Sequence, residues 1–280
     1  MRNSVVVGLA LLVAAPAFAD EADVHYRQGL TLKKQNKTDE AIQELLEAIK
    51  LRGNYAAAEY SLGLTYKMRN ENELAIEHLG KAARLEPKSA EMHSSLGIAM
   101  YRADKIDDAI RELEKACELN PNDAIAQQSL GAIYRGKKDM AKAIPHLEHA
   151  VMLEPKDAMA LSNLGVAYRQ SNKMAEAEKY FLKAIEINPE QAEFHFNLGT
   201  VYRRQGKSKE AIAEYEKAIK LDNKLASAHY DLGVMYKNEH RADDAIREWN
   251  TYLELVALKD PKEADVIRKH IQEMGGKPSK

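Results

Sequence analysis

The chain has 280 residues, of which 30% are charged and only 6% are aromatic, as expected of a helical protein with a large exposed surface. Its 41 basic and 43 acidic residues give a formal net charge of −2 at pH 7, which argues against nucleic-acid binding by bulk electrostatics. Cys117 is the only cysteine, so an internal disulfide is excluded.

Residues 1–19 have the pattern of a secretory signal peptide. Arg2 supplies a positive start, residues 5–18 form an apolar run, and a small-x-small cleavage site ends at Ala19. The run is shorter than the roughly 20 residues that a membrane-spanning helix needs. We therefore predict a bacterial exported protein, periplasmic after cleavage between Ala19 and Asp20 and without a membrane span from then on. The alternative is an uncleaved N-terminal anchor.

After this segment, a glycine recurs at intervals of 34 residues without a slip. The positions are Gly29, Gly63, Gly97, Gly131, Gly165, Gly199 and Gly233. A glycine inside a helix costs roughly 1 kcal/mol relative to alanine, so chance does not account for seven on one lattice. If the residue seven before each glycine is column 1, columns 1 and 20 hold alanine in every repeat. A 34-residue period is typical of a helix-turn-helix solenoid.

Seven repeats follow from this lattice, and each is predicted to form two helices, A and B. The repeats span residues 22–55, 56–89, 90–123, 124–157, 158–191, 192–225 and 226–259. Columns 7, 8 and 11 share one face of helix A, and columns 20, 21, 24, 27, 28 and 30 form an apolar stripe on helix B. Small residues at columns 8, 20 and 27 should let the two helices approach closely, while columns 11 and 24 fill the space beside the contact. Each pair must stack on the next to cover its apolar faces.

Turn residues agree with this division. Column 15 holds Asn, Asp or Gly in five repeats, which suits the left-handed conformation that ends a helix. Lys138 and His240 break this column and do not predict the turn in repeats four and seven. Proline at column 32 ends helix B in four repeats. Pro145 lies near the start of helix B in repeat four, where we expect a mild kink.

The columns L-G-x-x-Y, A-I, L/F/Y, A and P together resemble the tetratricopeptide repeat (TPR) family over residues 22–259. The resemblance implies an all-α fold, a right-handed α-solenoid of seven helix-turn-helix repeats. Column 4 departs from the family, because the frequent tryptophan is absent. It holds His25, Glu59, His93, Gln127, Leu161, His195 and His229.

The end of the chain is predicted to close the array. Residues 260–274 begin with Asp-Pro-Lys-Glu, a good helix start, and continue with apolar residues at helical spacing. They should form a capping helix on the last repeat. Residues 275–280 are expected to be a flexible tail.

The resemblance further implies a concave wall made by columns 2, 5, 6, 9, 12 and 13 of helix A. In column 6, Asn163 and Asn197 match an asparagine ladder that in some family members grips an extended peptide, since an amide both donates and accepts hydrogen bonds. The alternative is that they are polar residues facing a wet groove. Column 5 adds aromatic candidates that could anchor apolar side chains or simply pack: Tyr26, Tyr60, Phe196 and Tyr230.

Column 12 is basic in six of seven repeats and predicts a positive rail. It holds Lys33, Lys67, Tyr101, Arg135, Arg169, Arg203 and Lys237, with Arg204 beside it in column 13. Such a rail could attract an acidic segment or a C-terminal carboxylate. Alternatively, these cations only complement the helix dipole, worth about 0.3–1 kcal/mol each. The family's carboxylate clamp is absent, because column 9 has no asparagine and columns 2 and 5 have no basic residue.

No catalytic motif, cofactor motif or complete metal site is found in the sequence. His146 and His149 are three residues apart but lack a clear third ligand, so a solvated outer face is expected. We predict a non-enzymatic periplasmic scaffold or adaptor that binds protein or extended-peptide partners in its groove and helps to assemble an envelope complex. The alternatives are a self-associating coat or homo-oligomer, and a subunit that positions a separate enzyme.

Overall fold

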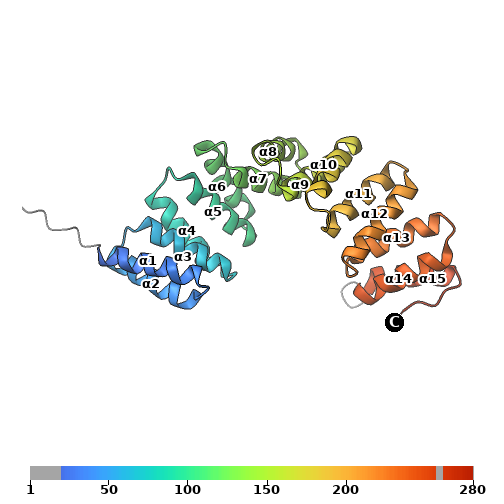
Figure 1. The fold of residues 1–280 in the computed structure, drawn as a ribbon, viewed down its shortest axis with the longest axis horizontal. Helices are drawn as coiled ribbons and strands as arrows, with labels where there is room; N and C mark the ends of the chain where they lie inside the picture. Colours follow the sequence, from blue (N-terminus) through green and yellow to red (C-terminus); the bar gives the residue numbers. More distant parts are fainter. Residues whose placement is uncertain (1–19, 257–260, 280) are drawn as a thin grey trace, which may run out of the picture. The chain divides into compact units, whose positions relative to one another are not determined.

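The computed structural model describes residues 20–256 and 261–279, which form helices joined by short turns, without a strand in those ranges (Figure 1). The predicted signal peptide lies outside the described residues. The chain divides into two compact units, an N-terminal unit of Met1–Asn120 and a C-terminal unit of Pro121–Lys280. The prediction of an all-α helical-repeat fold is confirmed.

The N-terminal unit holds three helix pairs. Its helices are α1 (Glu21–Lys34), α2 (Thr38–Leu51), α3 (Ala56–Met68), α4 (Asn72–Leu85), α5 (Ala90–Arg102) and α6 (Ile106–Leu119). Within each repeat, helix A packs against helix B, and α2 and α4 also pack against helix A of the following repeat.

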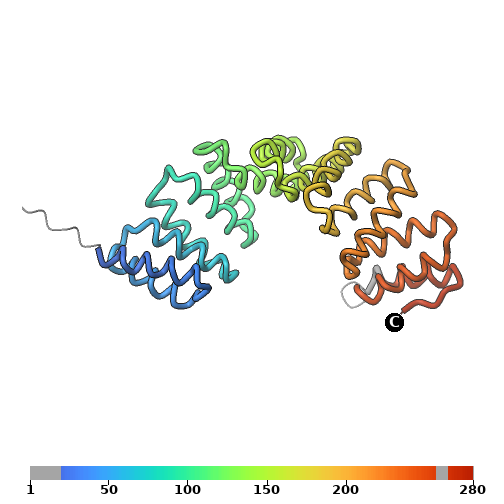
Figure 2. Tube along the Cα trace, viewed as in Figure 1, coloured from blue at the N-terminus to red at the C-terminus, as the bar shows by residue number. Residues whose placement is uncertain are grey.

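The C-terminal unit holds four helix pairs and a final helix. Its helices are α7 (Ala124–Gly136), α8 (Met140–Leu153), α9 (Ala158–Gln170), α10 (Met174–Ile187), α11 (Ala192–Arg204), α12 (Ser208–Leu221), α13 (Ala226–Asn238), α14 (Ala242–Val256) and α15 (Pro261–Glu273). From α3 onward, every helix A begins at the column-1 alanine. Figure 2 shows the same two-helix unit repeating along each part of the trace.

The two helices of a repeat meet where the column-8 glycine faces the column-24 side chain. A Cβ on Gly63 would lie 2.7 Å from Leu79 Cγ and 2.9 Å from the Leu79 backbone nitrogen. On Gly233 it would collide with the indole of Trp249. The column-24 side chains are all fully buried: Leu45, Leu79, Leu113, Leu147, Phe181, Tyr215 and Trp249. The close approach predicted from the small residues is confirmed.

The turn between helix A and helix B is the same in all seven repeats. Every column-15 residue has a positive φ, including Lys138 at 61° and His240 at 58°. The next backbone N–H then donates to the column-11 carbonyl, as Asp139 N does to Tyr134 O at 2.9 Å. The turn therefore forms even where the side chain does not favour it. Helix α8 continues through Pro145 without a break.

A polar pair joins columns 4 and 23 in six repeats, and this pairing was not expected from the sequence. The pairs, with their atom separations, are His25–Glu44 (2.6 Å), Glu59–His78 (2.6 Å), His93–Glu112 (2.7 Å), Gln127–His146 (2.7 Å), His195–Glu214 (2.6 Å) and His229–Glu248 (2.8 Å). Repeat five has Leu161 and Tyr180 instead, packed in one apolar cluster. The residue types of the pair change between repeats, but the two side chains always come from columns 4 and 23.

In repeats three, four, six and seven, the column-4 side chain also reaches the turn that precedes its own helix. His195 Nε2 lies 2.9 Å from Pro189 O, and Gln127 Nε2 donates to Pro121 O at 3.1 Å. Nδ1 of His195 thus faces a carboxylate of its own repeat, and Nε2 faces a carbonyl of the previous repeat. In these four repeats, column 4 connects helix B of its own repeat to the end of the previous repeat.

The last helix and the tail both pack on α14. Ala264, Ile267 and Ile271 of α15 share a buried cluster with Trp249 and Leu253. The tail, expected to be flexible, is tied down where it is described: Asn250 Nδ2 donates to Lys277 O at 3.2 Å, and Ser279 N donates to Asn250 Oδ1 at 2.6 Å. A single asparagine amide replaces the missing backbone partners of this segment.

Gly131→Ala is expected to lower the free energy of unfolding by about 1–3 kcal/mol, because the added methyl would lie 2.5 Å from Leu147 Cγ and 3.2 Å from Ala143 O. Gly136 is in the same helix, and a Cβ on it would meet no facing side chain or backbone within 4 Å, so Gly136→Ala is the matched control. It should leave stability unchanged or raise it by up to about 1 kcal/mol. Urea unfolding followed by circular dichroism measures both, and equal effects would contradict the close-contact argument.

Exchanging His195 and Glu214 is expected to preserve their contact, since repeat two already carries the reversed pair. His195→Glu alone places two carboxyl groups together, and Glu214→His alone places two imidazoles together. Because His195 is only 6% exposed, each single variant should lower the free energy of unfolding by about 3–5 kcal/mol. The double variant should recover all but about 1 kcal/mol, the hydrogen bond to Pro189 O. A double-mutant cycle tests this, and additive losses would show that the two side chains are not coupled.

Candidate functional site

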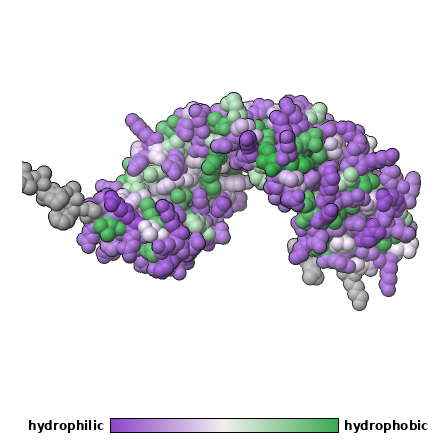
Figure 3. All heavy atoms as spheres, viewed as in Figure 1, coloured by the Kyte–Doolittle hydropathy of each residue, from purple (hydrophilic) through white to green (hydrophobic). Residues whose placement is uncertain are grey.

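The ten predicted groove residues fall into both units. Tyr26 and Tyr60 lie on α1 and α3 of the N-terminal unit. The other eight lie on α7, α9, α11 and α13 of the C-terminal unit: Arg135, Asn163, Arg169, Phe196, Asn197, Arg203, Arg204 and Tyr230. Figure 3 shows that hydrophilic side chains cover most of the visible surface of both units, with apolar ones in small groups. Each unit has its own helix-A surface, which is formed by columns 2, 5, 6, 9, 12 and 13 of its helices A.

On the C-terminal unit, the two asparagines differ in what they contact. Asn197 Oδ1 accepts from Arg169 Nη2 at 3.3 Å, and its Nδ2 donates to Glu193 O at 2.8 Å. Its amide is thus engaged within the protein. The Asn163 side chain is half-buried and has no hydrogen bond to any residue of the described ranges. Asn163 thus differs from Asn197 in having no partner for its amide among the described residues.

The arginines of this unit are also held by neighbours. Arg203 lies 3.7 Å from Asp231 Oδ1, and its Nε donates to the Tyr215 hydroxyl at 3.3 Å. Arg204 Nη1 donates to Arg169 O at 3.4 Å. Arg169 keeps a buried Nε with no partner among the described atoms. Much of the positive charge predicted here is therefore balanced or engaged inside the unit.

Burial shapes the charges of this network. The pKa of Asp231 is raised, chiefly by burial, although the Arg203 guanidinium opposes the shift. Burial also lowers the pKa of Arg169, and nearby Arg204 lowers it further. For Arg203, burial acts to lower the pKa, but Asp231 and Tyr215 together raise it overall. Burial therefore disfavours the charged form of each of these three side chains.

The N-terminal unit presents a different cationic surface, on Lys33 of α1 and Lys67 of α3, two helices in direct contact. Both side chains are half-buried, and within residues 20–256 neither has an ion pair or hydrogen bond. Burial lowers the pKa of Lys33. Burial, then the charges of Arg102 and Lys33, lowers the pKa of Lys67. The basic column pointed to both lysines, but only the structure distinguishes them from the engaged arginines.

The four predicted aromatic anchors each contact another side chain of their unit. The ring of Tyr26 lies 5.0 Å from that of Tyr55, and the rings of Phe196 and Tyr230 lie 5.8 Å and 5.4 Å from those of Tyr215 and Tyr252. The Tyr60 hydroxyl donates to Glu91 at 3.0 Å and lies 2.9 Å from Ser95 Oγ. All four remain half-buried. Each of them therefore has a packing role of its own on the helix-A surface.

His146 does not lie on a solvated outer face, contrary to expectation. Its Nδ1 is 2.7 Å from Gln127 Oε1 and its ring stacks at 5.9 Å on Tyr134. The column-4 partner draws it inward. Across the described residues, no three His, Cys, Asp or Glu side chains are grouped so that they could hold a metal ion. None of the described helices has the length and apolar character needed to cross a membrane.

Asp231→Asn is expected to change how stability depends on pH. Because the pKa of Asp231 is higher in the folded protein than its ordinary value of 3.8, the folded state binds the proton more tightly. Wild-type stability should therefore fall as the pH rises from 3.8 through the raised pKa, relative to the variant, which lacks this group. Urea midpoints of both proteins at pH 3.5 to 7 measure the difference.

The control for this experiment has the opposite sign. Hydrogen bonds from Arg241 and Arg247 lower the pKa of Asp244, so the stability it adds is lost as the pH falls. Asp244→Asn should therefore be most destabilising at neutral pH and least so in acid. The same trend in both variants would show that the pH effect does not come from burial of Asp231.

Comparisons with known proteins agree with this geometry. Family models described as TPR repeat or tetratricopeptide repeat match residues 29–69, 90–123, 124–157, 158–191, 180–213 and 199–239. No curated protein matches the chain.

Several solved structures are similar. The crystal structure of MamA is 30% identical, with a TM-score of 0.56 over 62% of this chain and 95% of MamA. That of YrrB, described as a TPR protein with an unusual peptide-binding site, is 22% identical, with a TM-score of 0.57 over 66% of this chain and 95% of YrrB. PilF of Pseudomonas aeruginosa is 22% identical, with a TM-score of 0.67 over 77% of this chain and 97% of PilF. The chain therefore belongs to the tetratricopeptide repeat family and has the fold of a protein-interaction scaffold.

Proposed function

We propose that this chain is an exported, periplasmic scaffold that binds acidic or C-terminal peptide segments of partner proteins on its helix-A surfaces. Its work would be to bring the components of an envelope complex together without catalysis. The TPR repeats support the binding role, as does the similarity to YrrB with its peptide-binding site. The N-terminal sequence pattern supports export.

The observation that carries the proposal is the pair Lys33 and Lys67. An ammonium group that is half-buried without a counter-ion loses hydration, and the lowered pKa of each lysine reflects that loss. Arg102 adds a third positive charge beside Lys67. A ligand carboxylate would relieve both the desolvation and the mutual repulsion, through charge-assisted hydrogen bonds.

The neighbouring residues suit a peptide more than a free ion. Leu30 and Leu64, one turn before the two lysines, are half-buried apolar residues on the same helices. They offer contact to the side chains that flank an acidic residue. On the C-terminal unit, Asn163 offers an amide for the backbone of an extended segment. The N-terminal unit thus supplies two cations beside apolar side chains, and the C-terminal unit supplies an amide.

Replacing Lys33 and Lys67 by alanine together is expected to weaken binding of an acidic peptide. A fluorescein-labelled (Glu-Ala)₄-Glu peptide is the probe, followed by anisotropy at about 50 mM salt. Each charge-assisted hydrogen bond is worth about 1.5–3 kcal/mol, so the loss should be about tenfold or more. The reason is direct: the two ammonium groups are the donors.

The matched control is Lys88→Ala with Lys115→Ala, which removes the same charge from exposed sites of the same unit. It should weaken binding by less than about twofold, because exposed charges are screened by salt. Equal losses in the two double variants would reduce the binding to non-specific electrostatics and overturn the proposed site.

A further inference from the structure

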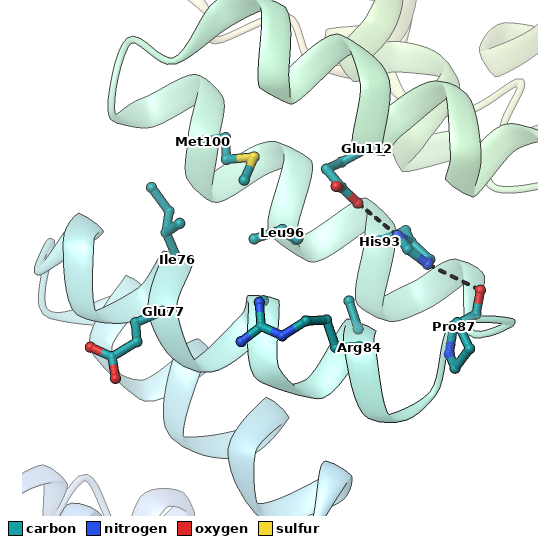
Figure 4. A pocket seen from close by; sticks show the side chains of 10 residues that line it. Ile76, Glu77, Arg84, Pro87, His93, Leu96, Met100 and Glu112 are labelled. Atoms are coloured by element: carbon teal, nitrogen blue, oxygen red, sulfur yellow. Dashed lines mark hydrogen bonds and ion pairs between the residues drawn. The ribbon is translucent and has the colours of Figure 1, made fainter.

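A pocket lies in the N-terminal unit, among α4, α5 and α6. It has a volume of about 590 Å³, and its walls include Ile76, Leu96 and Met100 (Figure 4). None of the predicted groove residues lines it, and neither does Lys33 or Lys67. It therefore belongs to a different surface from the helix-A columns discussed above.

The pocket exists because three columns hold a smaller or thinner residue here than elsewhere in the array. At column 25, Gly80 stands where the other repeats have Leu46, Glu114, Glu148, Leu182, Glu216 and Asn250. At column 28, Ala83 stands where they have Ile49, Cys117, Val151, Ile185, Ile219 and Leu253. At column 11, Met100 stands where five repeats have tyrosine. The same fold without these changes would fill the space.

Packing does not require the glycine at column 25. A Cβ on Gly80 would meet only Arg84 Nη1, at 3.5 Å, which is ordinary contact with the end of a flexible side chain. This contrasts with the column-8 glycines, where a Cβ would collide with the facing helix. Gly80 lies inside α4, where glycine weakens a helix. What the glycine provides is the open space of the pocket.

Among the described charged side chains that line the pocket, Arg84 is the cation without a partner. Glu77 is paired with Lys81 at 2.7 Å, and His93 is paired with Glu112 at 2.7 Å and with Pro87 O at 3.2 Å. Arg84 is exposed and has no ion pair or hydrogen bond within the described part of the chain. Figure 4 shows its side chain extended along the pocket, below Leu96.

We propose that this pocket binds the C-terminal residue of a partner polypeptide. The apolar side chain of that residue enters between Ile76, Leu96 and Met100, and its carboxylate pairs with Arg84. A long acyl chain fits less well, because it would have to lie against Glu77, His93 and Glu112. A single leucine-sized side chain leaves those groups beside the polar main chain of the peptide.

The test uses the whole chain with methyl-labelled methionine and alanine, titrated with acetyl-Ala-Ala-Leu as the free acid and as the amide. The free acid should shift the Met100 and Ala83 methyl signals with a saturating curve, and the amide should bind at least about tenfold more weakly. Absence of saturation, or equal binding of acid and amide, would overturn the proposal. So would tighter binding of octanoate, which would assign the pocket to an acyl chain.

Two variants make the assignment specific. Gly80→Leu with Ala83→Ile installs the leucine and isoleucine that repeats one and five carry at these columns, so the fold should persist while the peptide no longer shifts the Met100 methyl signal. Arg84→Gln should abolish the preference for the free acid, whereas Lys220→Gln, at the same column of repeat six, should not. Retained binding in the filled variant would contradict the pocket. Lys33 and Lys67 play no part in this readout, so the helix-A site can fail without affecting the result.

Discussion

In every repeat, a glycine of helix A lies against a large buried side chain of helix B, and the rest of the architecture depends on that contact. The absence of a Cβ lets the two backbones approach until the column-24 residue lies over the glycine. The facing residue grows from leucine in repeats one to four to phenylalanine, tyrosine and tryptophan in repeats five to seven, yet it stays buried throughout. The column-8 glycine therefore keeps the two helices of a repeat close together, while the column-24 residue that packs against it can vary in size.

The polar pair of columns 4 and 23 provides hydrogen-bond partners for buried polar side chains. Where the family often places a tryptophan, this chain places a hydrogen-bonding side chain that is held by a partner 19 residues later. A buried polar group left without a partner costs about 1–3 kcal/mol, so the two columns must change together. They do: His–Glu, Glu–His, Gln–His and an apolar Leu–Tyr pair occupy the same place. The second contact, to the preceding turn, links neighbouring repeats within a unit.

The two units carry similar basic columns but use them differently. In the C-terminal unit, Arg203 has Asp231 and Arg169 has Asn197, so much of the positive charge is engaged within the protein. In the N-terminal unit, Lys33 and Lys67 have no such partner among the described residues, and burial lowers the pKa of both. The same unit also holds the pocket made by Gly80 and Ala83. Departures from the repeat, more than the repeat itself, distinguish the surface of one unit from that of the other.

Sequence alone determined the period, the two helices of each repeat and the residues at their contact, because a 34-residue lattice of glycine and alanine has few other physical solutions. The pairing of columns 4 and 23 was not predicted, although the residues of both columns can be read from the sequence in every repeat. The histidines of column 4 are explained only by their partners in column 23. The turns at Lys138 and His240 could not be predicted from the sequence, because there the backbone hydrogen bond and helix packing outweigh side-chain preference. Tertiary structure decided which cations of a largely basic column lack a partner among the described residues. It also decided that the Asn197 amide is hydrogen-bonded within the protein while the Asn163 amide is not. Those facts depend on side chains contributed by neighbouring helices, whose distances no pattern within one repeat contains.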